Sequence, residues 1–118
     1  MDFNELLTDL LEPIDGSVAG FFCGIDGIGV ENVVYAPGID AAPTEVELTT
    51  VLKTVNDVAA NLRTGSVSGL ILETEKMDII IEQLSSDYFL CVLMKPDGNI
   101  GRGRIELKKL SKELRKEI

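Results

Sequence analysis

The sequence predicts an α/β fold of the α+β kind, in which a five-stranded, mainly antiparallel sheet lies between helices in the order αββαβββα. Apolar residues recur at helical spacing in three segments of the chain. Between residues 67 and 95, three apolar runs are so closely spaced that only hairpins can join them. The length of 118 residues, 45% of them hydrophobic, predicts a single domain over residues 1–118.

The first third of the chain predicts a helix followed by a hairpin. The helix is expected at about residues 2–12, where apolar side chains share one stripe, and Pro13 ends it. Strands at residues 18–24 and 29–36 are joined by a tight turn at Asp26-Gly27. The glycines here lack the lysine and hydroxyl residue of a Walker loop and open no helix as GxGxxG, so they indicate turns and close packing.

The strongest helix signal covers about residues 45–64. Thr44 and Glu47 have the spacing of a capping box, and Gly65 is expected to end the helix in the left-handed conformation. One arc of the helical wheel is apolar and predicts the face that packs on the sheet. Its residues are Leu48, Val51, Leu52, Val55, Val58, Ala59 and Leu62.

The opposite side of this helix is small and sparsely charged, whereas an ordinary solvated face is rich in Lys and Glu. Its residues are Val46, Thr50, Lys53, Thr54, Asp57, Ala60 and Asn61. Such side chains let another helix or a partner surface approach closely. A merely exposed, threonine-rich face fits the same residues equally well, so the composition leaves both interpretations open.

The second half of the chain predicts an antiparallel meander and a last helix. The runs at residues 70–72, 79–81 and 89–94 are continuously apolar, which predicts a sheet covered on both faces. The last helix is expected from about Asn99 to the chain end, with Leu107, Leu110, Leu114 and Ile118 on its buried stripe. Residues 102–118 hold seven bases and three acids, which favours a solvated face that complements the helix dipole over a nucleic-acid or lipid patch.

Composition argues against several functions. The net charge of −9 argues against a nucleic-acid partner, and no apolar run reaches the length of a membrane span, so a soluble, cytoplasmic protein without membrane insertion is expected. Without histidine, no metal site, no cofactor and no Ser-His-Asp or Cys-His chemistry is expected. Cys23 and Cys91 lie in apolar stretches and are interpreted as buried thiols. The carboxylates Asp15, Asp26 and Asp57 have no spacing that pairs them, so no catalytic residue is assigned and an enzyme ranks last.

Three stretches carry a resemblance to a known family. Residues 14–20 and 24–28 are similar to the first strand and turn of that family, and residues 87–93 are similar to its fifth strand. Asn99, Gly101 and Arg104 match the Asn-x-Gly-x-x-Arg pattern at the start of its last helix. In this order and spacing, the chain resembles the Roadblock/LC7 domain, and specifically the small bacterial members that regulate Ras-like GTPases.

The resemblance implies a non-catalytic homodimer that binds a Ras-like small GTPase and modulates its GTP hydrolysis, with no required arginine finger. In such proteins the third strand, here about residues 67–74, pairs with its twofold mate, and the second helix lies beside its mate. The implied dimer or partner interface consists of Val46, Thr50, Lys53, Thr54, Asp57, Asn61, Ser68, Leu70 and Leu72. Three alternatives remain open: a heterodimer with a similar chain, a nucleotide-independent scaffold, and a small-ligand sensor. The sensor would use either the glycine-rich strand region or the N–H groups at Asn99–Gly101.

Overall fold

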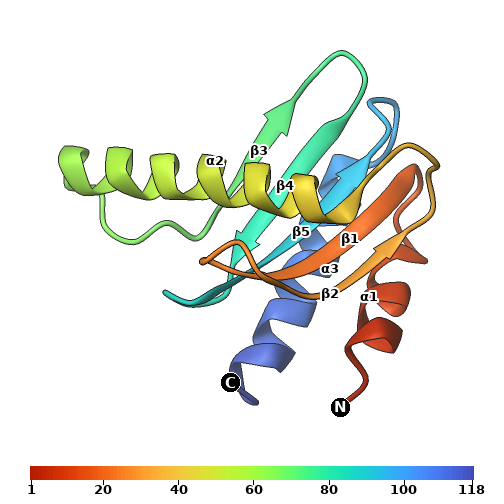
Figure 1. The fold of residues 1–118 in the computed structure, drawn as a ribbon, viewed down its shortest axis with the longest axis horizontal. Helices are drawn as coiled ribbons and strands as arrows, with labels where there is room; N and C mark the ends of the chain where they lie inside the picture. The colour runs from red at the N-terminus through yellow and green to blue at the C-terminus, as the bar shows by residue number, and fades with distance from the viewer.

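Three helices and one five-stranded antiparallel sheet form the fold, which a computed structural model describes over residues 1–118 (Figure 1). The order αββαβββα and the antiparallel sheet confirm the expected fold class. The elements are α1 (Phe3–Leu11), β1 (Ser17–Gly24), β2 (Gly29–Val34), α2 (Ala41–Leu62), β3 (Gly69–Glu73), β4 (Asp78–Gln83), β5 (Tyr88–Met94) and α3 (Ile100–Arg115).

The strand order in the sheet is β2-β1-β5-β4-β3. Strands β3, β4 and β5 form the expected meander, and β5 then pairs with β1 at the centre of the sheet. Nearly every residue of β1 and β5 is buried, because helices cover both of their faces. The order leaves β2 and β3 as the two edge strands, and their positions decide which parts of the backbone remain unpaired.

The helices form two layers around the sheet, with α1 and α3 behind it and α2 in front (Figure 1). Successive residues of β5 divide between the two interfaces, as the pleat requires. Leu90 and Val92 pack with Leu107 on the α1 and α3 side. Phe89 packs with Leu52 on the α2 side, in the same cluster as the two cysteines. Both cysteines are buried and free, which confirms their interpretation as core thiols.

The start of α2 differs from the expected capping box. The helix begins at Ala41, with Asp40 as the N-cap residue and no side-chain cap. The Thr44 hydroxyl donates to the Asp40 carbonyl oxygen at 2.7 Å, so Thr44 already lies inside the helix and does not cap it. Pro43 is accommodated because backbone N–H groups in a first helical turn have no partner to lose. The capping-box prediction is therefore wrong.

The end of α2 and the end of the last helix also differ from expectation. Arg63, with φ of 58°, adopts the left-handed conformation expected of Gly65, and Gly65 has a positive φ in the loop that follows. In α3 the three leucines of the expected stripe are buried, but Ile118 lies beyond the last turn and is 52% exposed. Strand ends differ from the expected positions by no more than two residues.

Helix α3 approaches the sheet closely at Gly103. A β-carbon at Gly103 would lie 2.7 Å from the Cδ1 atom of Ile80 and 3.6 Å from the Met94 sulfur. Both side chains are buried, so neither can swing into solvent to make room. Glycine in this helix interior is therefore a packing requirement, because it sets the distance between α3 and β4.

We expect Gly103→Val to lower the free energy of unfolding by about 1–3 kcal/mol, because the added carbons overpack the contact with Ile80. Urea denaturation followed by circular dichroism measures this change.

Gly101→Ala, two residues earlier in the same helix, is the matched control. A β-carbon there meets only the Asn99 Oδ1 atom, at 3.4 Å, so we expect a gain of up to about 1 kcal/mol. Equal losses for the two variants would contradict the packing argument.

Candidate functional site

Helix α2 crosses the strands, and its C-terminal half extends past β3 without any sheet beneath it (Figure 1). Leu48 and Leu52 in the N-terminal half are buried on the sheet. Val58 is 51% exposed and Leu62 is 69% exposed, so their assignment to the buried face is wrong. The stripe of apolar residues continues along the helix, but the sheet that would cover it ends.

All six predicted interface residues on α2 are exposed: Val46, Thr50, Lys53, Thr54, Asp57 and Asn61. The threonines are weakly hydrated for a specific reason. The Thr50 hydroxyl donates to the Val46 carbonyl oxygen at 3.1 Å, and the Thr54 hydroxyl donates to the Thr50 carbonyl oxygen at 2.9 Å. Hydroxyl groups that are bonded to the backbone lose little when a partner removes water from them.

The three predicted residues at the other end of the interface lie on or beside β3. The Gln83 N–H donates to the Ser68 carbonyl oxygen at 2.8 Å, which fixes the phase of the ladder between β3 and β4. Because the direction of the backbone hydrogen bonds alternates along an antiparallel strand, the N–H and C=O groups of Leu70 and Leu72 point toward β4. Gly69, Ile71 and Glu73 then direct their N–H and C=O groups away from the sheet. Ile71 is 38% exposed and Leu72 is 40% exposed, so this edge is both unpaired and apolar.

The opposite edge of the sheet, formed by β2, is partly blocked against the addition of another strand. On β2, the Glu31 carboxylate accepts a hydrogen bond from the Asn32 N–H at 2.9 Å. By the alternation along the β1–β2 ladder, this N–H points away from the sheet, so the Glu31 side chain occupies a position that an added strand would need. β3 carries no such side chain, which makes it the edge that is open to another strand.

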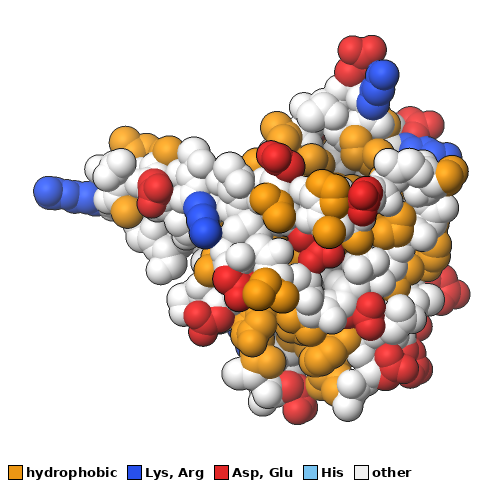
Figure 2. Space-filling model, viewed as in Figure 1, with side chains coloured by type: hydrophobic (Ala, Val, Ile, Leu, Met, Phe, Trp, Pro, Cys, Tyr) orange, Lys and Arg blue, Asp and Glu red, His pale blue; other side chains and the backbone are white.

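The apolar part of α2 and the α2-facing residues of β3 lie on the same side of the molecule. Leu70 packs at the margin of the core beneath α2, together with Ile79. Figure 2 shows hydrophobic side chains along α2, with separate charged groups of both signs between them on its overhanging part. The two regions that the sequence assigned to one interface are therefore brought together by the fold.

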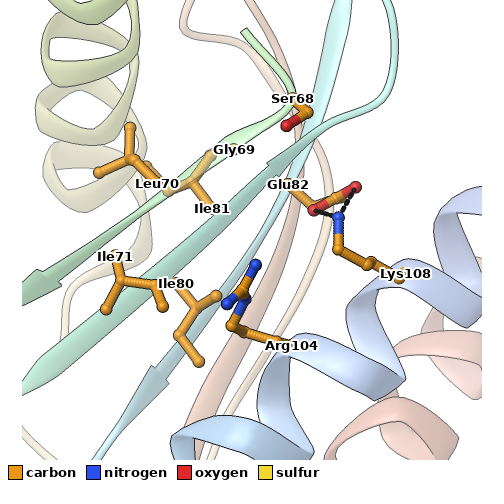
Figure 3. A pocket seen from close by; sticks show the side chains of 9 residues that line it. All are labelled: Ser68, Gly69, Leu70, Ile71, Ile80, Ile81, Glu82, Arg104 and Lys108. Carbon is orange, nitrogen blue, oxygen red and sulfur yellow. Dashed lines mark hydrogen bonds and ion pairs between the residues drawn. The ribbon is translucent and has the colours of Figure 1, made fainter.

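On the other side of β3, a groove of about 240 Å³ separates the strand from α3 (Figure 3). Ser68, Gly69, Leu70, Ile71, Ile80, Ile81, Glu82, Arg104 and Lys108 line it. The Glu82 carboxylate is paired with the Lys108 Nζ atom at 3.4 Å and with the Arg115 Nη2 atom at 4.0 Å. Arg104 forms no ion pair. Sequence reasoning placed Arg104 in the pattern at the start of the last helix and in the basic segment 102–118, and it missed this groove.

A buried carboxylate lies at the N-terminal end of α2. The Glu45 side chain occupies the space that a β-carbon at Gly29 would fill, and it forms no ion pair. Burial raises the pKa of Glu45. Burial, together with the nearby charge of Glu45, raises the pKa of the Cys23 thiol to about 12, and burial raises the pKa of Cys91 as well. Both thiols therefore stay protonated and unreactive at neutral pH.

No group of three or more cysteine, aspartate or glutamate side chains is placed to hold a metal ion. None of the helices combines the length and the apolar character that crossing a bilayer requires. At the start of α3, the Asn99 side chain accepts the Arg102 N–H at 2.9 Å, so one of the donors considered for a small anion is already engaged.

Comparison with solved structures identifies the family. The chain is 30% identical to MglC from Myxococcus xanthus over the whole of both chains, with a TM-score of 0.71. It superimposes on a Roadblock/LC7 domain from Streptomyces avermitilis with a TM-score of 0.89, covering 99% of this chain and 98% of that one at 15% identity. The chain belongs to the Roadblock/LC7 family.

Another solved structure has the same fold as this Roadblock/LC7 domain. The gliding protein MglB from Thermus thermophilus matches with a TM-score of 0.85 at 13% identity, over 96% of this chain and 85% of that one. No protein-family model matches the sequence, and no curated protein matches it. The assignment to this family therefore rests on the sequence identity with MglC and on the shared fold.

We expect Glu45→Gln to stabilise the Roadblock/LC7 domain at pH 7. Burial raises the pKa of Glu45 in the folded state above that in the unfolded chain, so the folded state holds the proton to a higher pH. The contribution of protonated Glu45 to the free energy of unfolding is fully present below the unfolded-state pKa of this carboxyl group, and it is lost as the pH rises through the folded-state pKa. Denaturation at several pH values should show the two proteins converging below about pH 4 and separating toward pH 7.

Glu47→Gln is the matched control, because Glu47 is exposed on the same helix. It should leave the pH profile of the wild type unchanged. If Glu45→Gln also follows the wild-type profile, burial does not control this carboxylate.

Proposed function

We propose that this Roadblock/LC7 domain is a non-catalytic, cytoplasmic, homodimeric platform that binds a Ras-like small GTPase and modulates its GTP hydrolysis. The observation that carries the proposal is that the overhanging half of α2 and the open edge of β3 are both exposed and lie on the same side of the molecule. Apolar side chains exposed on an unpaired edge strand and on a helix without a sheet beneath it are typical of an interface.

The β3 edge and the apolar part of α2 support self-association. Two β3 strands that pair about a twofold axis would join the sheets of two protomers into one, and the overhanging half of each α2 would then lie over the partner. Ser68, Leu70 and Leu72 would be at this junction, with Val58 and Leu62 above it. One structural relative, described as MglB with a tetrameric arrangement, shows that a protein of this fold forms assemblies.

The threonine-rich face of α2 supports the binding of a partner. In the proposed dimer, two copies of this face are adjacent and form one weakly hydrated surface, which consists of Val46, Thr50, Lys53, Thr54, Asp57 and Asn61. A GTPase whose switch region differs between its GTP and GDP forms would make different contacts with this surface. Any gain in hydrolysis would come from ordering the catalytic elements of the GTPase itself.

We expect the wild-type chain to have twice its 12.8 kDa mass in size-exclusion chromatography with light scattering. Leu72→Asp should shift it toward the monomer and raise the dimer Kd by about tenfold or more, because the dimer would bury an unpaired carboxylate.

Ile28→Asp is the matched control, because Ile28 is another exposed hydrophobic residue but lies on the β1–β2 turn, away from β3. It should leave the dimer unchanged. A monomeric wild type would refute the homodimer.

We expect Thr54→Lys to weaken GTPase binding by about tenfold while the fold is retained, since a long charged side chain keeps the partner surface apart. Biolayer interferometry with each Ras-like GTPase of the source organism, loaded with GDP or with a non-hydrolysable GTP analogue, measures the affinity.

A charge on the far side of the molecule provides the control: Asp9→Lys on α1, which is also exposed, should bind as the wild type does. Equal affinity for both nucleotide forms would indicate a nucleotide-independent scaffold. No complex with any GTPase in either form would refute the GTPase proposal.

A further inference from the structure

The groove between β3 and α3 holds more positive than negative charge. Arg104 and Lys108 line it together with a single carboxylate, that of Glu82, which is paired with Lys108 and, from outside the lining, with Arg115. This surplus is local, because the chain as a whole carries a net charge of −9. Arg104 is turned toward the strands in Figure 3 and has no acidic partner. The groove therefore has the charge to accept a second carboxylate.

The open edge of β3 limits where a second copy of the chain can supply that carboxylate. In an antiparallel β3–β3 ladder, only a twofold axis at Ile71 pairs all five residues from Gly69 to Glu73. Any other axis shortens the ladder, and an axis at Glu73 places two like charges directly opposite each other. With the axis at Ile71, Leu70 opposes the partner's Leu72 on the α2 side. On the α3 side, Gly69 opposes the partner's Glu73.

The Gly69 position adds no side chain of its own beside that glutamate. A β-carbon at Gly69 would lie 2.5 Å from the Ile81 carbonyl oxygen and 3.2 Å from the Glu82 Oε2 atom, so no side chain fits there and this end of the groove is lined by the Glu82 carboxylate that Lys108 and Arg115 pair. Residues directly opposite in a ladder have β-carbons about 5 Å apart. Glu73 of the partner subunit would therefore be within reach of the same groove that Arg104 and Lys108 line. Glu73 forms no ion pair within its own chain.

We propose that Arg104, assisted by Lys108, forms an ion pair with Glu73 of the partner subunit, and that this pair fixes the register of the β3–β3 ladder and selects a second copy of this chain. The inference rests on the homodimer of the proposed function. The twofold axis produces the contact twice in each dimer, so a single substitution acts at both ends of the interface.

A charge reversal on either side tests the pair. Glu73→Arg places an arginine opposite Arg104, and Arg104→Glu places a glutamate opposite Glu73, so each variant repels itself. We expect each to raise the Kd of its homodimer by about tenfold or more in analytical ultracentrifugation. Both residues are exposed, so the monomers should remain folded, which circular dichroism checks.

Mixing the two variants is the decisive measurement. In a heterodimer of Glu73→Arg with Arg104→Glu, both ends of the ladder again join opposite charges, so we expect a 1:1 mixture to dimerise with a Kd close to that of the wild type. The double variant, with both substitutions in one chain, should form a homodimer for the same reason. Restoration by mixing distinguishes a direct contact from a general loss of stability.

Two controls test whether the effect is specific to charges that lie at the groove. Glu75→Arg lies on the β3–β4 hairpin, and Lys112→Glu lies on α3 outside the groove lining; both residues are exposed, and both variants should dimerise as the wild type does.

The outcomes separate this inference from the homodimer itself. A monomeric wild type refutes both. A dimer that Leu72→Asp disrupts but that neither charge reversal weakens refutes the ion pair and leaves the homodimer standing. Weakened variants that mixing does not restore also refute the ion pair. If the charge reversals leave the dimer unchanged but Arg104→Glu abolishes binding of a synthetic glutamate-rich peptide, the groove holds an acidic partner in place of a second copy.

Discussion

The unpaired outer edge of β3 is the constraint on which the rest of the molecule depends. Its N–H and C=O groups at Gly69, Ile71 and Glu73 lie beside exposed apolar side chains. On the β2 edge, the Glu31 carboxylate accepts a hydrogen bond from the Asn32 N–H, whereas no side chain of β3 protects its edge in this way. The overhang of α2 occurs at this same edge. A helix of 22 residues is about 33 Å long, whereas five strands span only about 20 Å across, so a helix that crosses the strands must project past one edge.

The sequence predicted the elements and their order because each rests on local information. Helical spacing, hairpin-length connections and the continuous apolar runs of β4 and β5 do not depend on distant contacts, and the strand ends were correct to within two residues. The exposure of Val58 and Leu62 was not predictable in this way. A helical wheel orders residues around an axis but does not indicate where the sheet beneath that axis ends. The capping box failed for a similar reason, since its spacing is found inside helices as well as at their starts.

The residues of the proposed interface on α2 and β3 were predicted from a side-chain pattern and from family resemblance, and the fold brings them to one side of the molecule. The groove on the other side of β3 could not be proposed from the sequence. Gly69 and Arg104 are distant along the chain and meet only because α3 packs beside β4, at the distance that Gly103 sets. The sequence contained only a weak indication, the i, i+4 spacing of Arg104 and Lys108 on a basic helix of a chain that is acidic as a whole.

In the proposed dimer, the apolar side of β3 and its charged side would have different roles. Apolar burial beneath α2 can supply affinity but discriminates poorly between partners, because many surfaces can cover an exposed leucine. Charge supplies the discrimination, and here it must also overcome repulsion, because two copies that each carry −9 repel each other at long range. In the proposed dimer, a local surplus of cations at the edge of the sheet would favour the final approach of two acidic copies in the register that brings Glu73 of the partner subunit to Arg104. A slipped register of the proposed dimer would keep much of the apolar contact but would shorten the ladder and leave Arg104 unpaired, so the ion pair and the full-length ladder would favour the same alignment of the two strands.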